Sequence, residues 1–279
     1  MALTLYKPTT PARRHAGVRG WKSEVTKDTP EKSLLTVRPR NAGRNNQGKI
    51  TVRHRGGGAK RMIRNVDFAQ SKFDVPGTVV GIEYDPNRTA YIALLQYADG
   101  EKRYILAPSG LKPGAHIVSA TKRVEVTDGN RMPLKDIPVG MAIHNLEFRP
   151  GRGGVSVRSA GSAAVIMAVE GNVAQVKMPS GEIRVIPADA RASLGQLSNI
   201  DHGNVRLGKA GRTRHKGFRP TVRGKVMNPV DHPHGGGEGN QPIGMKHPKT
   251  PWGKNALGVK TRKKGKFSDS AILQRRPKK

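Results

Sequence analysis

The stretch at residues 90–107, AYIALLQYADGEKRYILA, indicates the fold class of this chain. It holds two runs rich in β-branched, aromatic and leucine residues, 90–97 and 102–107, on either side of Asp99 and Gly100. An Asp-Gly pair between two such runs is a strong local signal for a β-hairpin. The stretch therefore predicts two antiparallel strands joined by a tight turn.

Short runs of the same kind continue on both sides of this hairpin. They recur at intervals of roughly 8–12 residues with turn residues between them, a spacing that is typical of small barrels and sandwiches. No long helical pattern intervenes, and the only helical expectation is a short turn within 187–194. The expected strands are 79–84, 90–97, 102–107, 116–126, 141–148, 163–169, 172–178 and 182–186.

A loose internal repeat suggests how these strands are divided. The sequence LLQYADGEKRYILAP at 94–108 is echoed by AQVKMPSGEIRVIPA at 174–188. A coincidence of hairpin chemistry is the alternative, but we prefer two tandem small barrels, which should lean on each other because each is near the lower size limit for an independent core. The expected parts are a basic N-terminal extension at 1–64, a first barrel at 65–127, a second barrel at 128–200 and a basic C-terminal extension at 201–279.

The charge of the chain is large and unevenly distributed. Its 51 Lys and Arg exceed its 20 Asp and Glu, which gives a formal net charge of +31. Residues 1–64 carry +13 and 201–279 carry +16, whereas 65–200 carry only +2. Such a charge requires a polyanionic partner, for which nucleic acid, a membrane surface and an acidic protein are all options. The flanks are also poor in large apolar residues, so we expect them to become ordered only against that partner.

The sequence also excludes several classes of protein. No run approaches the roughly 18 apolar residues of a membrane span, and no apolar stretch with a cleavage site follows the N-terminus, MALTLYKPTT. The absence of cysteine excludes disulfides, cysteine-based zinc sites and thiol catalysis. We therefore expect a cytoplasmic protein without membrane attachment.

Among nucleic acids, folded RNA fits the composition best. Phe, Trp and Tyr total only twelve, too few for the stacking platforms of single-strand binders. Tyr84, Tyr91, Tyr97 and Tyr104 lie on expected strands, where core packing accounts for them. No helix-turn-helix, basic zipper or zinc finger is visible, which weakens sequence-specific DNA binding and favours structured RNA.

Three basic segments are the candidate RNA contacts. Arginine offers a planar fork that matches phosphate oxygens, and the interspersed glycines allow the backbone to approach closely. The segment RPGRGGV at 149–155 would be a basic loop on the barrel rim, with a plain turn as the alternative. The candidate RNA-binding residues are Arg40, Arg44, Lys49, Arg53, Arg55, Lys60, Arg61, Arg149, Arg152, Arg158, Arg219, Arg223, Lys225, His232, His234, Lys246 and Lys249.

The nonapeptide DHPHGGGEG at 231–239 fits several kinds of site. His232 and His234 could ligate a metal with a nearby carboxylate, but no familiar ligand spacing is present. A nucleotide-binding loop would need a Gly-Lys-Ser/Thr ending, and His232 as a general base oriented by Asp231 lacks a nucleophile. We prefer a loop embedded in folded RNA. No metal or cofactor is expected, apart from magnesium ions bound by the RNA nearby.

Four long motifs carry a resemblance to a known family. GRNNQGKITVRHRGGGAKR at 43–61, EYDPNRTAYIALLQYADGEKRYILAP at 83–108, RPTVRGKVMNPVDHPHGGGEG at 219–239 and HPKTPWGK at 247–254 resemble the ribosomal protein L2 family, in its bacterial form. The resemblance runs from about residue 6 to 276 but leaves 16–36 and 241–245 without a close match. It implies an OB-fold barrel followed by an SH3-like barrel, with RNA-binding tails.

The resemblance also implies a function. It identifies a structural, non-enzymatic protein that binds large-subunit ribosomal RNA, supports subunit assembly and association, and buttresses the peptidyl transferase region and transfer RNA binding. The implied partners are other ribosomal proteins, the small subunit and nearby transfer RNA, with no membrane and no homo-oligomer. His232 is implied as an accessory group near the peptidyl transferase region. The rival functions are an enzyme that uses Asp231, His232 and Glu238, and an architectural DNA-binding protein.

Overall fold

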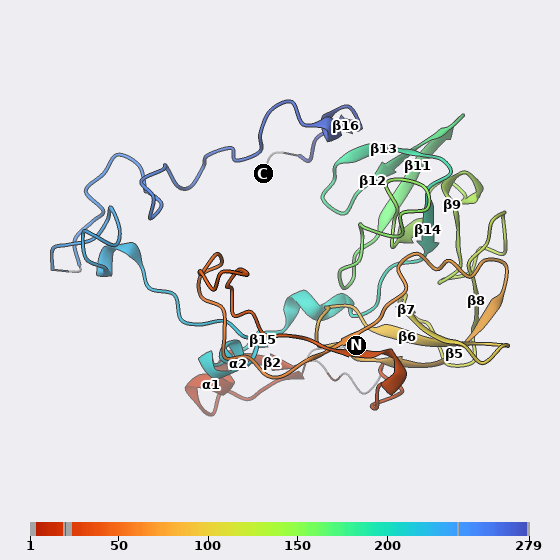
Figure 1. Ribbon diagram of the computed structural model, residues 1–279, viewed down its shortest axis with the longest axis horizontal. Helices are drawn as coiled ribbons and strands as arrows, with labels where there is room; N and C mark the ends of the chain where they lie inside the picture. The colour runs from red at the N-terminus through yellow and green to blue at the C-terminus, as the bar shows by residue number, and fades with distance from the viewer. Residues whose placement is uncertain (1–3, 19, 21–23, 239, 278–279) are drawn as a thin grey trace. The chain divides into compact units, whose positions relative to one another are not determined.

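The computed structural model describes residues 4–18, 20, 24–238 and 240–277 (Figure 1). It divides into two compact units. The barrel unit comprises 1–39, 60–209 and 268–279, and the basic unit comprises 40–59 and 210–267. The described part is mainly β, as predicted, and its helices are short. The expected boundaries near 64, 127 and 200 stay predictions.

The first barrel contains the hairpin that the sequence predicts within 90–107. Its antiparallel sheet has the order β7-β6-β5-β8. Ile92 of β6 pairs with Leu106 of β7, and Gln96 pairs with Lys102. Gly100 has a φ of +81° in the turn, a conformation that favours glycine. The strands are β5 (Pro76–Glu83), β6 (Ile92–Tyr97), β7 (Lys102–Leu106) and β8 (His116–Val118).

The core of the first barrel bears out most of the tyrosine assignments. Tyr91, Tyr97 and Tyr104 are buried, but Tyr84 is 55% exposed because it lies just beyond the end of β5. The strand expected at 116–126 ends at Val118, since Ser119 turns away to bridge two other segments. Beside the barrel, β3 (Leu35–Val37) pairs with β4 (Met62–Arg64).

The second barrel is a seven-stranded sheet in the order β16-β13-β12-β11-β10-β14-β9. The C-terminal strand β16, which sequence analysis did not anticipate, pairs with β13. The strand expected at 141–148 is confined to β10, because Asn145 adopts a positive φ of 48°. The strands are β9 (Arg131–Pro133), β10 (Ala142–His144), β11 (Ala164–Glu170), β12 (Val173–Lys177), β13 (Ile183–Pro187), β14 (Arg191–Leu194) and β16 (Ile272–Gln274).

The short turn expected within 187–194 is present only at Ala188 and Asp189 and is not helical, because the second half of the segment is strand β14. This strand pairs with β9 on one side and β10 on the other. Ala192 and Leu194 are fully buried in the barrel core. Pairing on both edges and burial of two side chains override the helix preference of an alanine-rich segment.

The two barrels lean on each other, as expected from their size. Pro108 and Leu197 form a β-bridge between them. The amide of Asn145 donates to the carbonyl of Phe68 over 3.1 Å, and the backbone N–H of Gly154 donates to the same carbonyl over 2.9 Å. A Cβ at position 154 would overlap the Asn145 side chain, so glycine is required there. The junction is therefore tightly packed.

The remaining elements are small. A three-stranded sheet in the order β1-β2-β15 forms from the N-terminal segment and the residues after the second barrel. No helix in the described residues has the length and apolar character to cross a membrane. These elements are β1 (Thr4–Leu5), α1 (Pro11–Arg14), β2 (Ala16–Val18), η2 (Lys32–Leu34), η3 (Leu134–Asp136), η4 (Ile200–Asn204), β15 (Arg206–Leu207), α2 (Ala210–His215), η5 (Gly224–Val226) and η6 (Phe267–Asp269).

The buried His144 predicts an acid-sensitive fold. Its Nδ1–H donates to the carbonyl of Gly195 over 2.9 Å, and burial lowers its pKa to about 4. In the unfolded chain the histidine pKa is about 6.5, so the imidazole takes up its proton at a higher pH than in the folded chain. The stability that His144 contributes is therefore complete above about pH 6.5. It falls by up to about 3 kcal/mol as the pH drops toward 4.

The measurement is the free energy of unfolding as a function of pH for the wild type and for His144→Asn. The asparagine amide keeps a donor near the position of Nδ1 but does not titrate. We expect a weaker pH dependence between pH 4 and 6.5 in the variant. Identical slopes for the two proteins would contradict the assignment.

Candidate nucleic-acid interface

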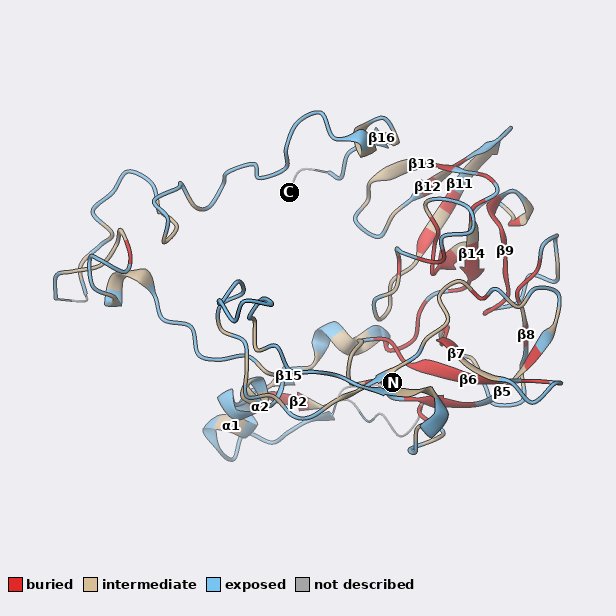
Figure 2. Ribbon diagram, in the orientation of Figure 1, coloured by how far each residue is buried: buried red, intermediate tan, exposed pale blue. Residues whose placement is uncertain are grey.

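The basic unit has a high charge and little core. Its two segments contain 19 Lys and Arg against two Asp and Glu, a net charge of +17. Among its described residues only His232 is buried, and none belongs to a hydrophobic cluster. Figure 2 shows buried residues concentrated on the strands of the barrels, whereas 40–59 and 210–267 are mostly exposed or intermediate. Apolar burial cannot balance the entropy of ordering such a unit, so a bound polyanion must contribute.

Backbone contacts join the two segments of the basic unit. Arg55 and Phe218 form an antiparallel bridge, and the N–H of Arg219 donates to the carbonyl of His54 over 3.0 Å. The N–H of Gly56 donates to Gly217 over 2.9 Å. A Cβ on Gly58 would lie 2.9 Å from the Cα of Gly217, so glycine permits this close approach. The two flanks were predicted as separate extensions, and their pairing has no signal in the sequence.

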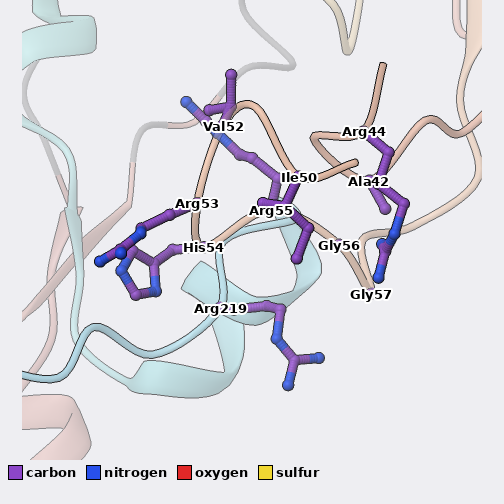
Figure 3. Close-up of a pocket in the computed structure, with 10 residues that line it drawn as sticks. All are labelled: Ala42, Arg44, Ile50, Val52, Arg53, His54, Arg55, Gly56, Gly57 and Arg219. Atoms are coloured by element: carbon purple, nitrogen blue, oxygen red, sulfur yellow. The ribbon is translucent and has the colours of Figure 1, made fainter. Parts of the chain in front are cut away.

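A hollow of about 590 Å³ opens where these segments meet (Figure 3). In the close-up Arg219 lies on the second segment, while the other lining residues lie on the first. The lining residues are Ala42, Arg44, Ile50, Val52, Arg53, His54, Arg55, Gly56, Gly57 and Arg219.

Two arginines of the hollow form cation–π contacts with aromatic rings. The guanidinium of Arg55 lies 4.2 Å from the ring centre of Phe218, and that of Arg53 lies 5.6 Å from Trp252. Such cation–π contacts orient a guanidinium plane without neutralising its charge. None of the four arginines in the hollow forms an ion pair with a carboxylate in the described residues. The hollow is therefore suited to phosphate groups.

The structure brings together most of the residues predicted from the sequence. Twelve of the seventeen lie in the basic unit, and of those twelve only His232 is buried. These twelve are Arg40, Arg44, Lys49, Arg53, Arg55, Arg219, Arg223, Lys225, His232, His234, Lys246 and Lys249. The other five belong to the barrel unit and are Lys60, Arg61, Arg149, Arg152 and Arg158.

The residues on the barrel unit differ in their surroundings. Arg149 and Arg152 are exposed on the turn between β10 and β11, as a rim position requires. Arg158 instead packs into the junction of the barrels: its guanidinium lies 4.4 Å from the ring centre of Phe68 and donates to the carbonyl of Gly154. Burial lowers the pKa of Arg158. Its observed contacts hold the junction together.

Sequence analysis missed the aromatic supports and the basic helix α1. Trp252 and Phe218 were not among the predicted residues, although each lies against an arginine that was. Helix α1 exposes Arg13 and Arg14 on the barrel unit. A signal for this helix was available, because Thr10 caps its first turn and proline occupies its first position.

The loop containing DHPHGGGEG folds back on itself. The N–H of Gly236 donates to Met227 over 3.0 Å, and that of Gly235 donates to the carbonyl of His232 over 2.8 Å. His232 is 8% exposed, whereas Asp231 and Glu238 are exposed. Within the described residues, no three His, Asp or Glu side chains come together as a metal site. Gly239 lies outside the described residues.

Comparison with known families gives two matches along the chain. The RNA-binding N-terminal domain of ribosomal proteins L2 matches residues 31–119, and the C-terminal domain of ribosomal proteins L2 matches residues 127–253. Together the two domains cover more than half of the sequence and include every strand of the two barrels except β16. The second match extends through the glycine-rich loop and ends just after Trp252.

Proposed function

Since this chain belongs to the ribosomal protein L2 family, we propose that its basic unit is the surface with which it binds large-subunit ribosomal RNA. The family is structural and non-enzymatic in general, and its members are RNA-binding components of the large ribosomal subunit. The proposal assigns the main contacts to the hollow and the loops around it. The barrels then serve as the rigid base from which the basic segments extend.

One observation carries this assignment. The hollow is lined by four arginines from two distant segments, and these arginines have no carboxylate partner in the described residues. Bringing like charges together is unfavourable unless an anion lies between them. Phosphate oxygens match the fork of arginine in both charge and geometry. A folded RNA presents such phosphates at close spacing.

We extend this proposal to the seventeen residues predicted from the sequence. The exposed cations of the basic unit would contact phosphates, and Arg149 and Arg152 would continue the contact onto the barrel rim. Arg158 would act indirectly, by fixing the junction. The RNA supplies the counter-charge that the basic unit lacks, so the two would become ordered together.

The wider proposed role follows from the RNA segments that the basic unit would bind. By joining RNA segments, the protein would support assembly of the large subunit and its association with the small subunit. It would also buttress the peptidyl transferase region and the binding of transfer RNA. In this role the RNA performs the chemistry, and the protein contributes shape. Other ribosomal proteins and the small subunit are the remaining proposed partners.

The proposal predicts a steep salt dependence and a preference for RNA. Neutralising about six phosphates should lower the affinity by roughly a thousandfold between 50 and 200 mM salt. The measurement is equilibrium binding of the full chain to large-subunit ribosomal RNA and to duplex DNA of equal length, at matched salt. We expect tighter binding to the RNA. Tighter binding to the duplex DNA would favour the architectural DNA-binding role instead.

A further inference from the structure

Two histidines of the glycine-rich loop lie against each other. The ring centres of His232 and His234 are 4.7 Å apart, with an angle of 56° between the ring planes. The backbone N–H of His234 donates to Nδ1 of His232 over 3.0 Å. The backbone N–H of Lys249 donates to Nε2 of His234 over 2.8 Å. Each imidazole therefore accepts a hydrogen bond from the main chain, but through a different nitrogen.

These bonds determine where each neutral ring carries its proton. A ring nitrogen that accepts a hydrogen bond has no proton, so the other nitrogen must carry it. His232 is thus protonated at Nε2, and His234 at Nδ1. Turning either ring over would place a carbon opposite the backbone N–H and leave that donor without an acceptor, so the hydrogen-bond network selects the observed orientation.

Two glycines permit the close packing of the loop at His232. A Cβ on Gly224 would overlap the imidazole of His232, and a Cβ on Gly235 would overlap the carbonyl of Asn228. That carbonyl also accepts the backbone N–H of His232 over 3.3 Å. The bond from His234 back to the His232 side chain spans two residues, which is the geometry of an Asx-turn with histidine in place of asparagine.

We propose that His232 and His234 form a clasp of two fixed, opposite tautomers that ties the glycine-rich loop to the segment at Lys249. The bond to the Lys249 backbone crosses from the loop to a segment fifteen residues further along the chain. The histidines are positioning residues in this arrangement. The inference rests on the proposed function, because the clasp shapes the part of the basic unit that would meet the RNA.

The clasp also restricts what His232 can do chemically. Its Nε2 has no hydrogen-bond partner in the described residues, yet it is not among the polar atoms sealed from solvent. With Nδ1 occupied, Nε2 carries the proton and acts as a donor. An acceptor oxygen of RNA is the ligand that matches this donor. A general base would need an unprotonated nitrogen facing the substrate, so the clasp is incompatible with that role.

Amide side chains provide a selective test of the clasp. The asparagine oxygen can take the place of Nδ1, and the glutamine oxygen can take the place of Nε2. We therefore expect His232→Asn and His234→Gln to keep the loop closed. The matched controls, His232→Gln and His234→Asn, should open it. The readout is tryptic cleavage after Lys246 in the full chain bound to large-subunit ribosomal RNA. The opened variants should be cleaved roughly fivefold faster, the effect of one lost hydrogen bond.

A further readout reports the two tautomers directly. Nitrogen NMR of the histidine rings in the full chain should show an unprotonated Nδ1 for His232 and an unprotonated Nε2 for His234. The clasp is overturned by equal cleavage of all four variants or by the reverse tautomers.

Failure of the proposed function would look different. If the wild-type chain did not bind large-subunit RNA, the proposed function would be wrong, and the ring-nitrogen signals of the full chain would still decide the clasp. If RNA binding were normal in all variants but cleavage did not follow the asparagine and glutamine pattern, only the clasp would be wrong.

Discussion

Replacing Glu147 with Gln should lower the free energy of unfolding of the chain by about 3–5 kcal/mol, because it leaves a buried charge without its counter-ion. Arg131 and Glu147 are 0% and 2% exposed, and Nη2 of Arg131 lies 2.8 Å from Oε1 of Glu147. Nη1 donates to the carbonyl of Asn145 over 2.8 Å. The other carboxylate oxygen of Glu147 accepts backbone N–H groups from Gly151 and Arg191. This pair therefore joins β9, β14 and the turn after β10.

The surroundings of Arg131 do not compensate for the loss of the Glu147 carboxylate. Burial already lowers the pKa of Arg131, and its Nε is sealed from solvent without a hydrogen-bond partner in the described residues. The measurement is calorimetric or denaturant unfolding of the full chain. Replacing both residues with apolar ones, Arg131→Met and Glu147→Leu, should recover much of the loss, since the buried charge then disappears as well.

An exposed ion pair provides the control. Lys135 and Asp189 lie 2.9 Å apart, but their side chains are 52% and 69% exposed. Solvent screens such a pair, so Asp189→Asn should leave the unfolding transition where it is. A similar small effect for Glu147→Gln would contradict the assignment of Arg131 and Glu147 as a buried, unscreened ion pair that joins β9, β14 and the turn after β10.

The parts of the fold that could be predicted from the sequence are those with local signals. Asp99 and Gly100 mark a turn whose geometry depends on adjacent residues, and the flanking runs are long enough to show their strand character. Strand β14 lacked such a signal, because its alanines acquire a strand conformation only from neighbours on both sides. The same holds for β16, which pairs with a strand about ninety residues earlier.

The candidate site shows the same division between local and distant information. The density of arginine led to Arg53, Arg55 and Arg219 as predicted RNA contacts, since charge is read directly from the sequence. Their meeting in one hollow depends on the bridge between Arg55 and Phe218, which no local pattern encodes. The partners of His232 were equally hidden, because hydrogen bonds to ring nitrogens depend on the folded loop.

Removing the three arginines Arg53, Arg55 and Arg219 together, by substitution with alanine, should weaken binding of large-subunit RNA by roughly a thousandfold. Each contributes a charge-assisted contact worth about 1.5 kcal/mol, and 1.4 kcal/mol corresponds to a factor of ten. The slope of log affinity against log salt should also become shallower by about 2 to 3, because fewer counterions are released. The measurement is a binding isotherm at several salt concentrations.

Two matched controls decide whether the hollow itself is responsible. The variant Lys112→Ala/Lys122→Ala/Lys177→Ala removes the same charge from exposed positions on the barrel unit. If only overall charge matters, both triple variants should bind RNA equally weakly, and the hollow would not be a specific contact site.

Replacing the three arginines with lysine keeps the charge but removes the planar fork. That variant should retain the wild-type salt slope while its affinity falls, since the counterions are still released but the two-pronged phosphate contacts are gone. A loss of slope with lysine would show that the arginines act by holding the two segments together, because an opened hollow would lose its phosphates even though every charge remained.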